Sequence, residues 1–344
     1  MLRISRRNLF TAALLGLMLS LASTMALAQF YTKGTLVKNL APAKNVDPQL
    51  VNAWGLTYAP SNPFWISDAG SGFTTIYNAA GVKQAPGIIV PPASGAGPGS
   101  PTGIVYNGST EFKIMTWTSL FLFATLDGTI SGWSHFNPGA ALIAVNNSGS
   151  GAVYTGLAIT SKPSGNFIYA ADTANNKVDV YDGTFKFVTS FTDKNLPAGF
   201  TPFGIQDING QVYVAFADVN GGPGGYIDIF TENGSFVKTL ISGAPLNQPW
   251  GLAVAPSNFG PLSNTLLVSN NINFKSTING FDLTTGAFVG TIKNKLGNPI
   301  KIDQLWGIRF GGGTSANGQT NQLFFTAGPK NNVNGLFGVI KFKP

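Results

Sequence analysis

Acidic and amide residues end four apolar runs of this sequence. The runs are 64-FWISD-68, 167-FIYAAD-172, 212-VYVAFAD-218 and 265-TLLVSN-270, and their last residues are Asp68, Asp172, Asp218 and Asn270. Oxygen ligands of this kind, gathered around one point, suit calcium, which is a hard cation. Each Asp also begins a turn, where its side chain can accept hydrogen bonds from the backbone amides that follow. The recurrence favours the turn role, because one metal site rarely needs a repeated ligand. Calcium binding is the second interpretation.

Few other residues are suited to catalysis. His135, in 131-SGWSHFNPG-139, is the single histidine, and cysteine is absent. One histidine excludes the multi-histidine sites of zinc and copper enzymes, and the lack of cysteine excludes thiol catalysis and disulfides. No GxSxG elbow accompanies a Ser/His/Asp order, and Glu111 and Glu232 offer no obvious two-carboxylate arrangement. We therefore identify no catalytic residues and expect a non-catalytic protein, with His135 an incidental residue of an exposed loop.

Aromatic residues precede a glycine at four positions. They are Trp54, Phe203, Trp250 and Trp306, and amide residues lie just before the three indoles, at Asn52, Gln248 and Gln304. Flat apolar ring faces flanked by amide donors and acceptors suit carbohydrate rings or extended polar chains. The alternative interpretation is that the rings wedge between neighbouring sheets and fill the space left by the glycines. The two roles can overlap.

These aromatic positions belong to a repeat. Related segments occur at 54-WGLTY-58, 102-TGIVY-106, 155-TGLAI-159, 203-FGIQD-207, 250-WGLAV-254 and 306-WGIRF-310, and their glycines recur at intervals of 47–56 residues. Six units of this length are typical of the blades of a β-propeller. The 43 Gly, the 26 Phe and the low charged fraction of 10% also predict an all-β protein.

The ring is predicted to close through the N-terminus. Each unit contains further apolar runs separated by turns, which predict four antiparallel strands per blade. The sixth unit stops at Pro344 after its third run, whereas 34-GTLVKNL-40 matches 234-GSFVKTL-240 almost position for position. We therefore predict that an N-terminal strand completes the last blade and removes an open sheet edge. The predicted fold is an all-β, six-bladed propeller of four-stranded antiparallel blades that forms one domain over residues 29–344.

The repeat also places the aromatic residues relative to one another. In a propeller, the loops that enter the innermost strands surround the central channel on one face. In blade order, the residues before the six glycines are Trp54, Thr102, Thr155, Phe203, Trp250 and Trp306. Because the sixth blade adjoins the first, the four aromatics are expected to form a crescent that the two threonines complete. This crescent is the candidate ligand-binding face.

The third unit resembles a known repeat. Its segment 165-GNFIYAADTANNKVDVYD-182 resembles an NHL repeat, and residues 30–344 are similar to an uncharacterised family of exported bacterial propeller proteins. This resemblance implies the fold more firmly than an activity. Six-bladed propeller lactonases are similar in fold and hold a metal at the channel mouth. That likeness implies, as an alternative function, a calcium-dependent hydrolase or lactonase, although the first blade has no clear counterpart of the lactonase glutamate.

The N-terminal 28 residues resemble an export signal. A basic segment contains Arg3, Arg6 and Arg7, an apolar segment covers residues 9–21, and 26-ALA-28 is a typical cleavage site. The stretch 5-SRRNLF-10 resembles a twin-arginine signal, and a general secretory signal and an uncleaved anchor are the alternatives. We expect a mature chain that starts at Gln29 and is periplasmic or extracellular, without a membrane anchor.

Charge and composition limit the classes of partner that this protein is expected to bind. Residues 1–28 carry three arginines and no acid, so cleavage lowers the formal net charge from +7 to +4, and the remaining lysines are scattered. We therefore expect a monomer with no nucleic-acid partner. The sequence favours a binding or scaffold module for a glycan, a peptide or a protein at the aromatic-lined face, and calcium is the one candidate cofactor.

Overall fold

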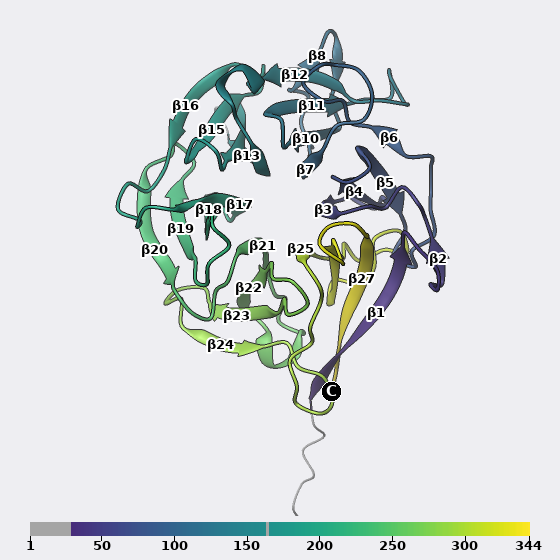
Figure 1. Cartoon of the computed structure of the whole chain (residues 1–344), viewed down its shortest axis with the longest axis vertical. Coiled ribbons are helices and arrows are strands. Elements are labelled where there is room, and N and C mark those ends of the chain that lie inside the picture. The colour runs from purple at the N-terminus through teal and green to yellow at the C-terminus, as the bar shows by residue number, and fades with distance from the viewer. Residues whose placement is uncertain (1–28, 163–164) are drawn as a thin grey trace, which may run out of the picture.

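The chain folds as a ring of six sheets. The computed structural model describes residues 29–162 and 165–344, and the predicted export signal, residues 1–28, lies outside the described residues. Six sheets of four antiparallel strands, one of them extended by a short parallel strand, surround a central axis (Figure 1). The prediction of an all-β, six-bladed propeller is confirmed.

The strands follow one another from the axis outward in each blade. Blade 1 contains β3 (Ala53–Thr57), β4 (Phe64–Asp68), β5 (Phe73–Tyr77) and β6 (Ile88–Ile89). Blade 2 contains β7 (Pro101–Tyr106), β10 (Phe121–Thr125), β11 (Thr129–Trp133) and β12 (Leu142–Asn146), beside the hairpin β8 (Lys113–Ile114) and β9 (Trp117–Thr118). Blade 3 contains β13 (Tyr154–Lys162), β14 (Gly165–Asp172), β15 (Lys177–Asp182) and β16 (Phe187–Phe191). Blade 4 contains β17 (Phe200–Ile208), β18 (Gln211–Asp218), β19 (Tyr226–Thr231) and β20 (Phe236–Ser242). Blade 5 contains β21 (Pro249–Val254), β22 (Thr265–Asn270), β23 (Ile278–Asp282) and β24 (Phe288–Thr291). Blade 6 contains β25 (Leu305–Phe310), β26 (Gln322–Ala327), β27 (Leu336–Lys343) and β1 (Phe30–Lys38), to which β2 (Asn45–Val46) is added. Two short 3₁₀ helices are η1 (Ser148–Ser150) and η2 (Gly260–Leu262).

The first strand closes the ring, as predicted. β1 pairs antiparallel with β27 from Phe30 opposite Lys343 to Lys38 opposite Leu336 (Figure 1). Its Tyr31 is buried, and the hydroxyl donates a hydrogen bond of 2.7 Å to the carbonyl of Phe259 in blade 5. The strand therefore covers the outer edge of β27 and also anchors the last blade to its neighbour.

The glycine of each repeat lets neighbouring inner strands approach closely. A Cβ on Gly55 would stand 2.6 Å from the carbonyl oxygen of Thr102 in the next blade. A Cβ on Gly307 would stand 2.7 Å from the carbonyl oxygen of Trp54, so the same contact joins the last blade to the first. The glycines of the other repeats meet the next inner strand in the same way. Contact between backbones therefore explains the repeated glycine.

Apolar side chains fill the spaces between adjacent blades. At the closure, Phe64 of blade 1 packs against Phe324 and Phe337 of blade 6, at centroid distances of 4.4 and 5.5 Å, and all three rings are fully buried. Two outer strands had no clear sequence signal, because β6 has only two residues and β12 lacks the Gly-x-Phe start of β16, β20 and β24. Within residues 29–162 and 165–344, no helix is both long and apolar enough to span a bilayer.

Candidate functional site

The four aromatic residues expected to form a crescent converge on the propeller axis. Trp54 and Trp306 stack with ring centroids 3.6 Å apart and an interplanar angle of 18°. Trp250 meets both indoles edge-on, at 6.0 and 5.9 Å, and Phe203 contacts them at 6.3 and 5.7 Å. The three indoles are only 4–8% exposed. This aromatic cluster, made of Trp54, Phe203, Trp250 and Trp306, therefore fills the channel where the inner strands begin.

Thr102 and Thr155, which complete the circle of residues around the axis, donate hydrogen bonds to backbone carbonyls. Thr155 Oγ1 donates to the carbonyl of Phe203 at 2.8 Å, and Thr102 Oγ1 donates to that of Tyr154 at 2.6 Å. Trp250 spans the channel, since its Nε1 donates to the carbonyl of Thr155 in blade 3 at 3.0 Å. Packing thus accounts for much of the cluster, and ligand contact by its rings stays a prediction.

The predicted amide residues fasten the loops around the cluster. Asn52, Gln248 and Gln304 each lie two residues before an indole with a positive φ of 50°, 52° and 46°. Gln248 Nε2 donates to the carbonyl of Asp218 at 2.9 Å. Gln304 Oε1 accepts a hydrogen bond of 2.7 Å from the amide of Asn332. The Gln248 contact joins loops of adjacent blades, whereas the Gln304 contact joins the start of β25 to the β26–β27 loop of the same blade.

Three polar atoms converge over Gly328, directly after β26. A Cβ on Gly328 would stand 2.5 Å from Oδ1 of Asn52 and 2.5 Å from Oδ1 of Asn332. The same point lies 3.2 Å from Nε1 of Trp306. All three atoms are buried, as is Nε1 of Trp54, and none has a hydrogen-bond partner in the described part of the chain. We call Asn52, Trp306, Gly328 and Asn332 the polar cradle.

The loop 328–334 supplies Asn332 to the cradle in an unusual conformation. Lys330, Asn331 and Asn332 are consecutive non-glycine residues with φ of 57°, 59° and 64°. Asp303 holds this loop, because its carboxylate accepts a hydrogen bond of 2.8 Å from the amide of Lys330. Such backbone outliers persist where the surroundings enforce them, and they cluster at ligand sites. Sequence reasoning missed this loop, because nothing in the repeat predicts its φ angles.

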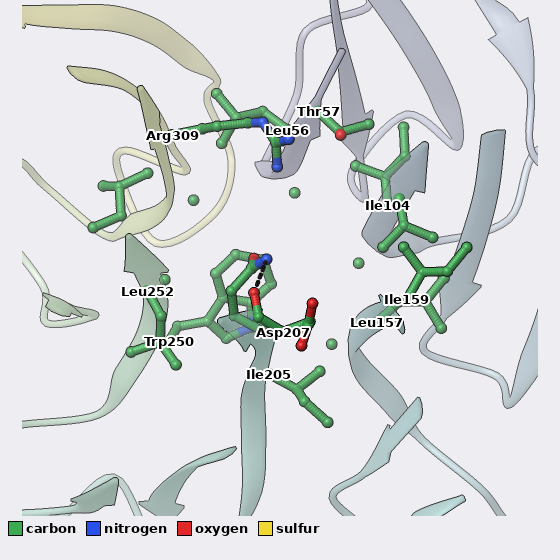
Figure 2. A pocket seen from close by; sticks show the side chains of 18 of the residues that line it. Leu56, Thr57, Ile104, Leu157, Ile159, Ile205, Asp207, Trp250, Leu252 and Arg309 are labelled. Atoms are coloured by element: carbon green, nitrogen blue, oxygen red, sulfur yellow. Dashed lines mark hydrogen bonds between the residues drawn. The ribbon is translucent and has the colours of Figure 1, made fainter. Parts of the chain in front are cut away.

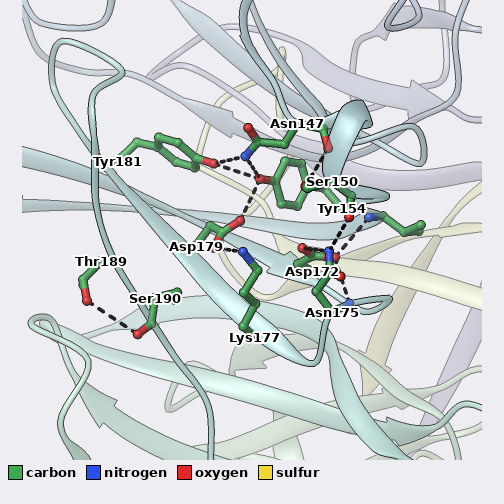
Figure 3. A network of polar contacts seen from close by, with 11 residues as sticks. Asn147, Ser150, Tyr154, Asp172, Asn175, Lys177, Asp179, Tyr181, Thr189 and Ser190 are labelled. Carbon is green, nitrogen blue, oxygen red and sulfur yellow. Dashed lines mark hydrogen bonds and ion pairs between the residues drawn. The ribbon is translucent and has the colours of Figure 1, made fainter.

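Two of the predicted acidic residues hold turns. Asp172 accepts hydrogen bonds from the amide of Val153 at 3.1 Å and from the amide and side chain of Asn175 at 3.3 and 2.7 Å (Figure 3). Asp218 accepts one from the amide of Asn220 at 2.9 Å. Both carboxylates are therefore engaged in the way expected of turn caps.

The other two candidate calcium ligands also contact their own surroundings. Asn270 Oδ1 accepts the amide of Asn247 at 2.8 Å, and Asp68 accepts the hydroxyl of Thr75 at 2.7 Å. Burial raises the pKa of Asp68 well above its usual range. Among the described residues, no three His, Cys, Asp or Glu side chains are grouped so that they could hold a metal ion. Calcium binding stays a prediction.

A cavity of about 230 Å³ continues along the axis beside the aromatic cluster. Trp250 lines it, together with aliphatic side chains of the inner strands, among them Leu157 and Leu252 (Figure 2). Asp207 near the end of β17 and Arg309 near the end of β25 face this channel cavity from different blades (Figure 2). Sequence reasoning did not select these two charged residues.

A second cavity, of about 720 Å³, lies between blades 1 and 2. Trp65 and Phe121 line it, stacked at 4.0 Å with an interplanar angle of 16°, and Trp133 lies 4.7 Å from Trp65. His135 stands at its rim, exposed and 4.9 Å from the ring of Trp133. The exposed-loop position expected for His135 is thus observed. The cavity itself was missed, although aromatic residues near the starts of β4 and β10 were its signal.

The chain has relatives in a giant virus. No protein-family model matches it. "Uncharacterized protein R648" of Acanthamoeba polyphaga mimivirus is 31% identical over 320 residues, which cover 87% of this chain and 76% of that protein. "Uncharacterized protein L690" of the same virus is 31% identical over 288 residues, covering 77% and 75%. The chain belongs to the family of these two proteins. Their names assign no activity to this family.

Solved structures agree on the fold alone. A protein of unknown function from Bacteroides thetaiotaomicron has a TM-score of 0.56 at 11% identity, covering 91% of this chain and 76% of that one. A catalytically inactive virginiamycin B lyase from Staphylococcus aureus, solved with quinupristin, has a TM-score of 0.53 at 13% identity, covering 91% and 99%. Propellers host many unrelated functions, so these likenesses transfer no activity.

Proposed function

We propose that this protein is a non-catalytic binding module that holds a hydroxyl group of a glycan in the polar cradle. The proposal rests on the convergence of Asn52 Oδ1, Asn332 Oδ1 and Trp306 Nε1 over Gly328. A hydroxyl both accepts and donates, so it pairs with the indole N–H and with an amide oxygen at once. A peptide carbonyl only accepts and a peptide N–H only donates, so neither group alone pairs with both kinds of atom. The cradle therefore favours a glycan over a peptide or protein ligand.

Burial makes this match energetically significant. Asn52 is 8% exposed and Trp306 is 4% exposed. A buried polar group without a partner costs about 1–3 kcal/mol, so a ligand that satisfies several such groups gains affinity from each. The positive φ angles of Lys330 to Asn332 fit the same role, because they fix the loop that presents Asn332.

We further propose that the module is an NHL-type propeller exported by the segment 1–28. The NHL-like residues 165–182 coincide with the hairpin β14–β15, whose turn holds Asp172. After cleavage before Gln29, the protein acts as a monomer in the periplasm or outside the cell. N-terminal sequencing of the protein recovered from the cell exterior tests this step, and a chain that retains Arg6 contradicts cleavage.

The calcium-dependent hydrolase or lactonase is the weaker candidate. Asp172 and Asp218 already accept turn amides, and Asp68 is fully buried with a raised pKa, which disfavours the charged form that a cation needs. Titration calorimetry with calcium tests this function. Heat of binding that disappears in Asp172→Asn would support it.

A glycan array tests the cradle with two variants that act on it differently. Trp306→Phe keeps an aromatic ring but removes the N–H donor, and Gly328→Ala places a methyl group among the three polar atoms. Each variant is expected to weaken glycan binding at least about tenfold, the equivalent of one hydrogen bond to a buried group.

The matched control is Gly139→Ala, because a Cβ at that position meets no atom within 4 Å. It is expected to bind as the wild type does, and circular dichroism confirms that all three variants are folded. The glycan proposal is rejected if the wild type binds peptides but no glycan, or if both cradle variants bind a glycan with unchanged affinity.

A further inference from the structure

The channel cavity carries one acidic and one basic side chain among aliphatic neighbours. In the six repeat segments that build the inner strands, only 203-FGIQD-207 and 306-WGIRF-310 contain a charged residue. These residues are Asp207 and Arg309, and the aliphatic side chains beside them include Ile205 and Ile308. The other blades carry uncharged residues at these two repeat positions, so the acid and the base are departures from the repeat that packing alone does not require.

The two charges stand where the channel meets the surface. Asp207 and Arg309 line both the channel cavity and an adjoining shallower hollow of about 300 Å³, which also includes Tyr58. The Arg309 guanidinium lies 4.7 Å from the centroid of the Tyr58 ring, so the aromatic face orients the cation. A solute that enters the channel from the hollow therefore passes both groups.

Neither charge is neutralised by the other. No ion pair joins Asp207 and Arg309 within the part of the chain that the structure describes, and Asp207 Oδ1 and Arg309 Nε are buried atoms without a hydrogen-bond partner there. Burial raises the pKa of Asp207 to about 6, the charge of Glu232 adds to the shift, and a hydrogen bond from the backbone of Gly210 opposes it. The cavity is therefore lined by a carboxylate and a guanidinium that do not pair with each other.

We propose that the channel cavity binds a small aliphatic zwitterion, with its ammonium group at Asp207 and its carboxylate at Arg309. Guanidinium and carboxylate form strong charge-assisted hydrogen bonds, and an ammonium supplies charged donors to the carboxylate of Asp207. Aliphatic side chains of the lining, such as Leu157 and Leu252, accommodate the hydrocarbon part. The volume of about 230 Å³ lies below the roughly 300–1,000 Å³ of drug-sized sites, which selects a ligand of amino-acid size. This site is separate from the polar cradle and does not depend on it.

Titration calorimetry of the full chain at about pH 7.5 tests the proposal, since Asp207 is then ionised. The probes are L-leucine and 6-aminohexanoate, which differ in the separation of the two charges. Each has counterparts that lack one charge, 3-methylbutylamine and 4-methylpentanoate for leucine. We expect one zwitterion to bind at least about tenfold more tightly than its single-charge counterparts, because each lost charged hydrogen bond costs about that factor.

Variants assign the binding to the two residues. Asp207→Asn and Arg309→Gln are each expected to weaken the zwitterion at least about tenfold. Lys194→Gln, which removes an exposed positive charge, is the matched control and is expected to change nothing. The proposal is overturned if neither zwitterion binds, if a single-charge counterpart binds as tightly, or if both channel variants bind like the wild type. The comparison among probes uses the wild type, so it holds even where a variant is unstable.

Discussion

The indoles of Trp54 and Trp306 stack at 3.6 Å although one belongs to the first blade and the other to the last. Two further contacts join the same blades at the axis: Thr326 Oγ1 donates a hydrogen bond to the carbonyl of Trp54, and Gly307 faces that carbonyl. β1 closes the ring at its outer edge, and this group of contacts closes it at its centre. The propeller is therefore closed by contacts at its outer edge and by contacts at its axis.

Removing an indole from the stack should reduce the free energy of unfolding. Trp306→Ala is expected to cost about 3–5 kcal/mol, as for other buried large aromatic side chains, because a cavity opens among rings that pack on all sides. Urea denaturation followed by circular dichroism measures the loss. Trp117→Ala is the control, since that indole is 49% exposed, and it should cost less than about 1 kcal/mol. Equal losses in the two variants would contradict a structural role for the stack.

A methyl group on a repeat glycine should prevent blades from closing. A Cβ on Gly204 would overlap the carbonyl of Trp250 in blade 5, and the two backbones cannot separate without disturbing the whole ring. Gly204→Ala is therefore expected to give little soluble protein, or a melting temperature lowered by several degrees. Gly139→Ala, in open space, should express and melt like the wild type. A Gly204→Ala variant as stable as this control would contradict the packing explanation.

The repeat made the architecture predictable. Gly55 and its five counterparts occur at blade-length intervals, and the match of 34–40 to 234–240 identified the closing strand. The same register predicted which aromatic residues would meet. How deeply these rings are buried was not predictable. The repeat places the side chains around the axis, but it does not show that Trp54 and Trp306 stack flat against each other.

The candidate sites were harder to predict, because they lie where the repeat is broken. Asn332 joins the cradle only through three successive positive φ angles, and although asparagine tolerates this region, the propensity of Lys330 does not favour it. The charges of Asp207 and Arg309 depart from an uncharged pattern in the sequence, yet only the closed ring brings blades 4 and 6 to one cavity. Long-range geometry of this kind has no local sequence signature.

Loss of the first strand should expose the edge of β27. Tyr31 is 4% exposed and Val37 is fully buried, so a chain that begins at Leu40 loses apolar contacts as well as backbone pairing. We expect this truncated chain to self-associate through the open edge, which light scattering after size exclusion detects. Tyr31→Phe is the milder test: it removes the hydroxyl that contacts Phe259 and should cost about 1–3 kcal/mol. A truncated chain that stays monomeric with an unchanged melting temperature would refute the closing role.

The pH dependence of stability should reveal the buried carboxyl of Asp228 in β19. Burial raises its pKa from 3.8 to about 7, and the charge of Asp193 adds to the shift. The folded state therefore keeps a proton that the unfolded chain releases, so stability is lost as the pH rises from about 4 to about 7. Asp228→Asn removes this loss, which amounts to a few kcal/mol at about 1.4 kcal/mol for each pH unit of displacement. Melting temperatures of variant and wild type should coincide near pH 4 and diverge by pH 8, with the variant higher. A constant difference across this range would show that Asp228 titrates alike in both states.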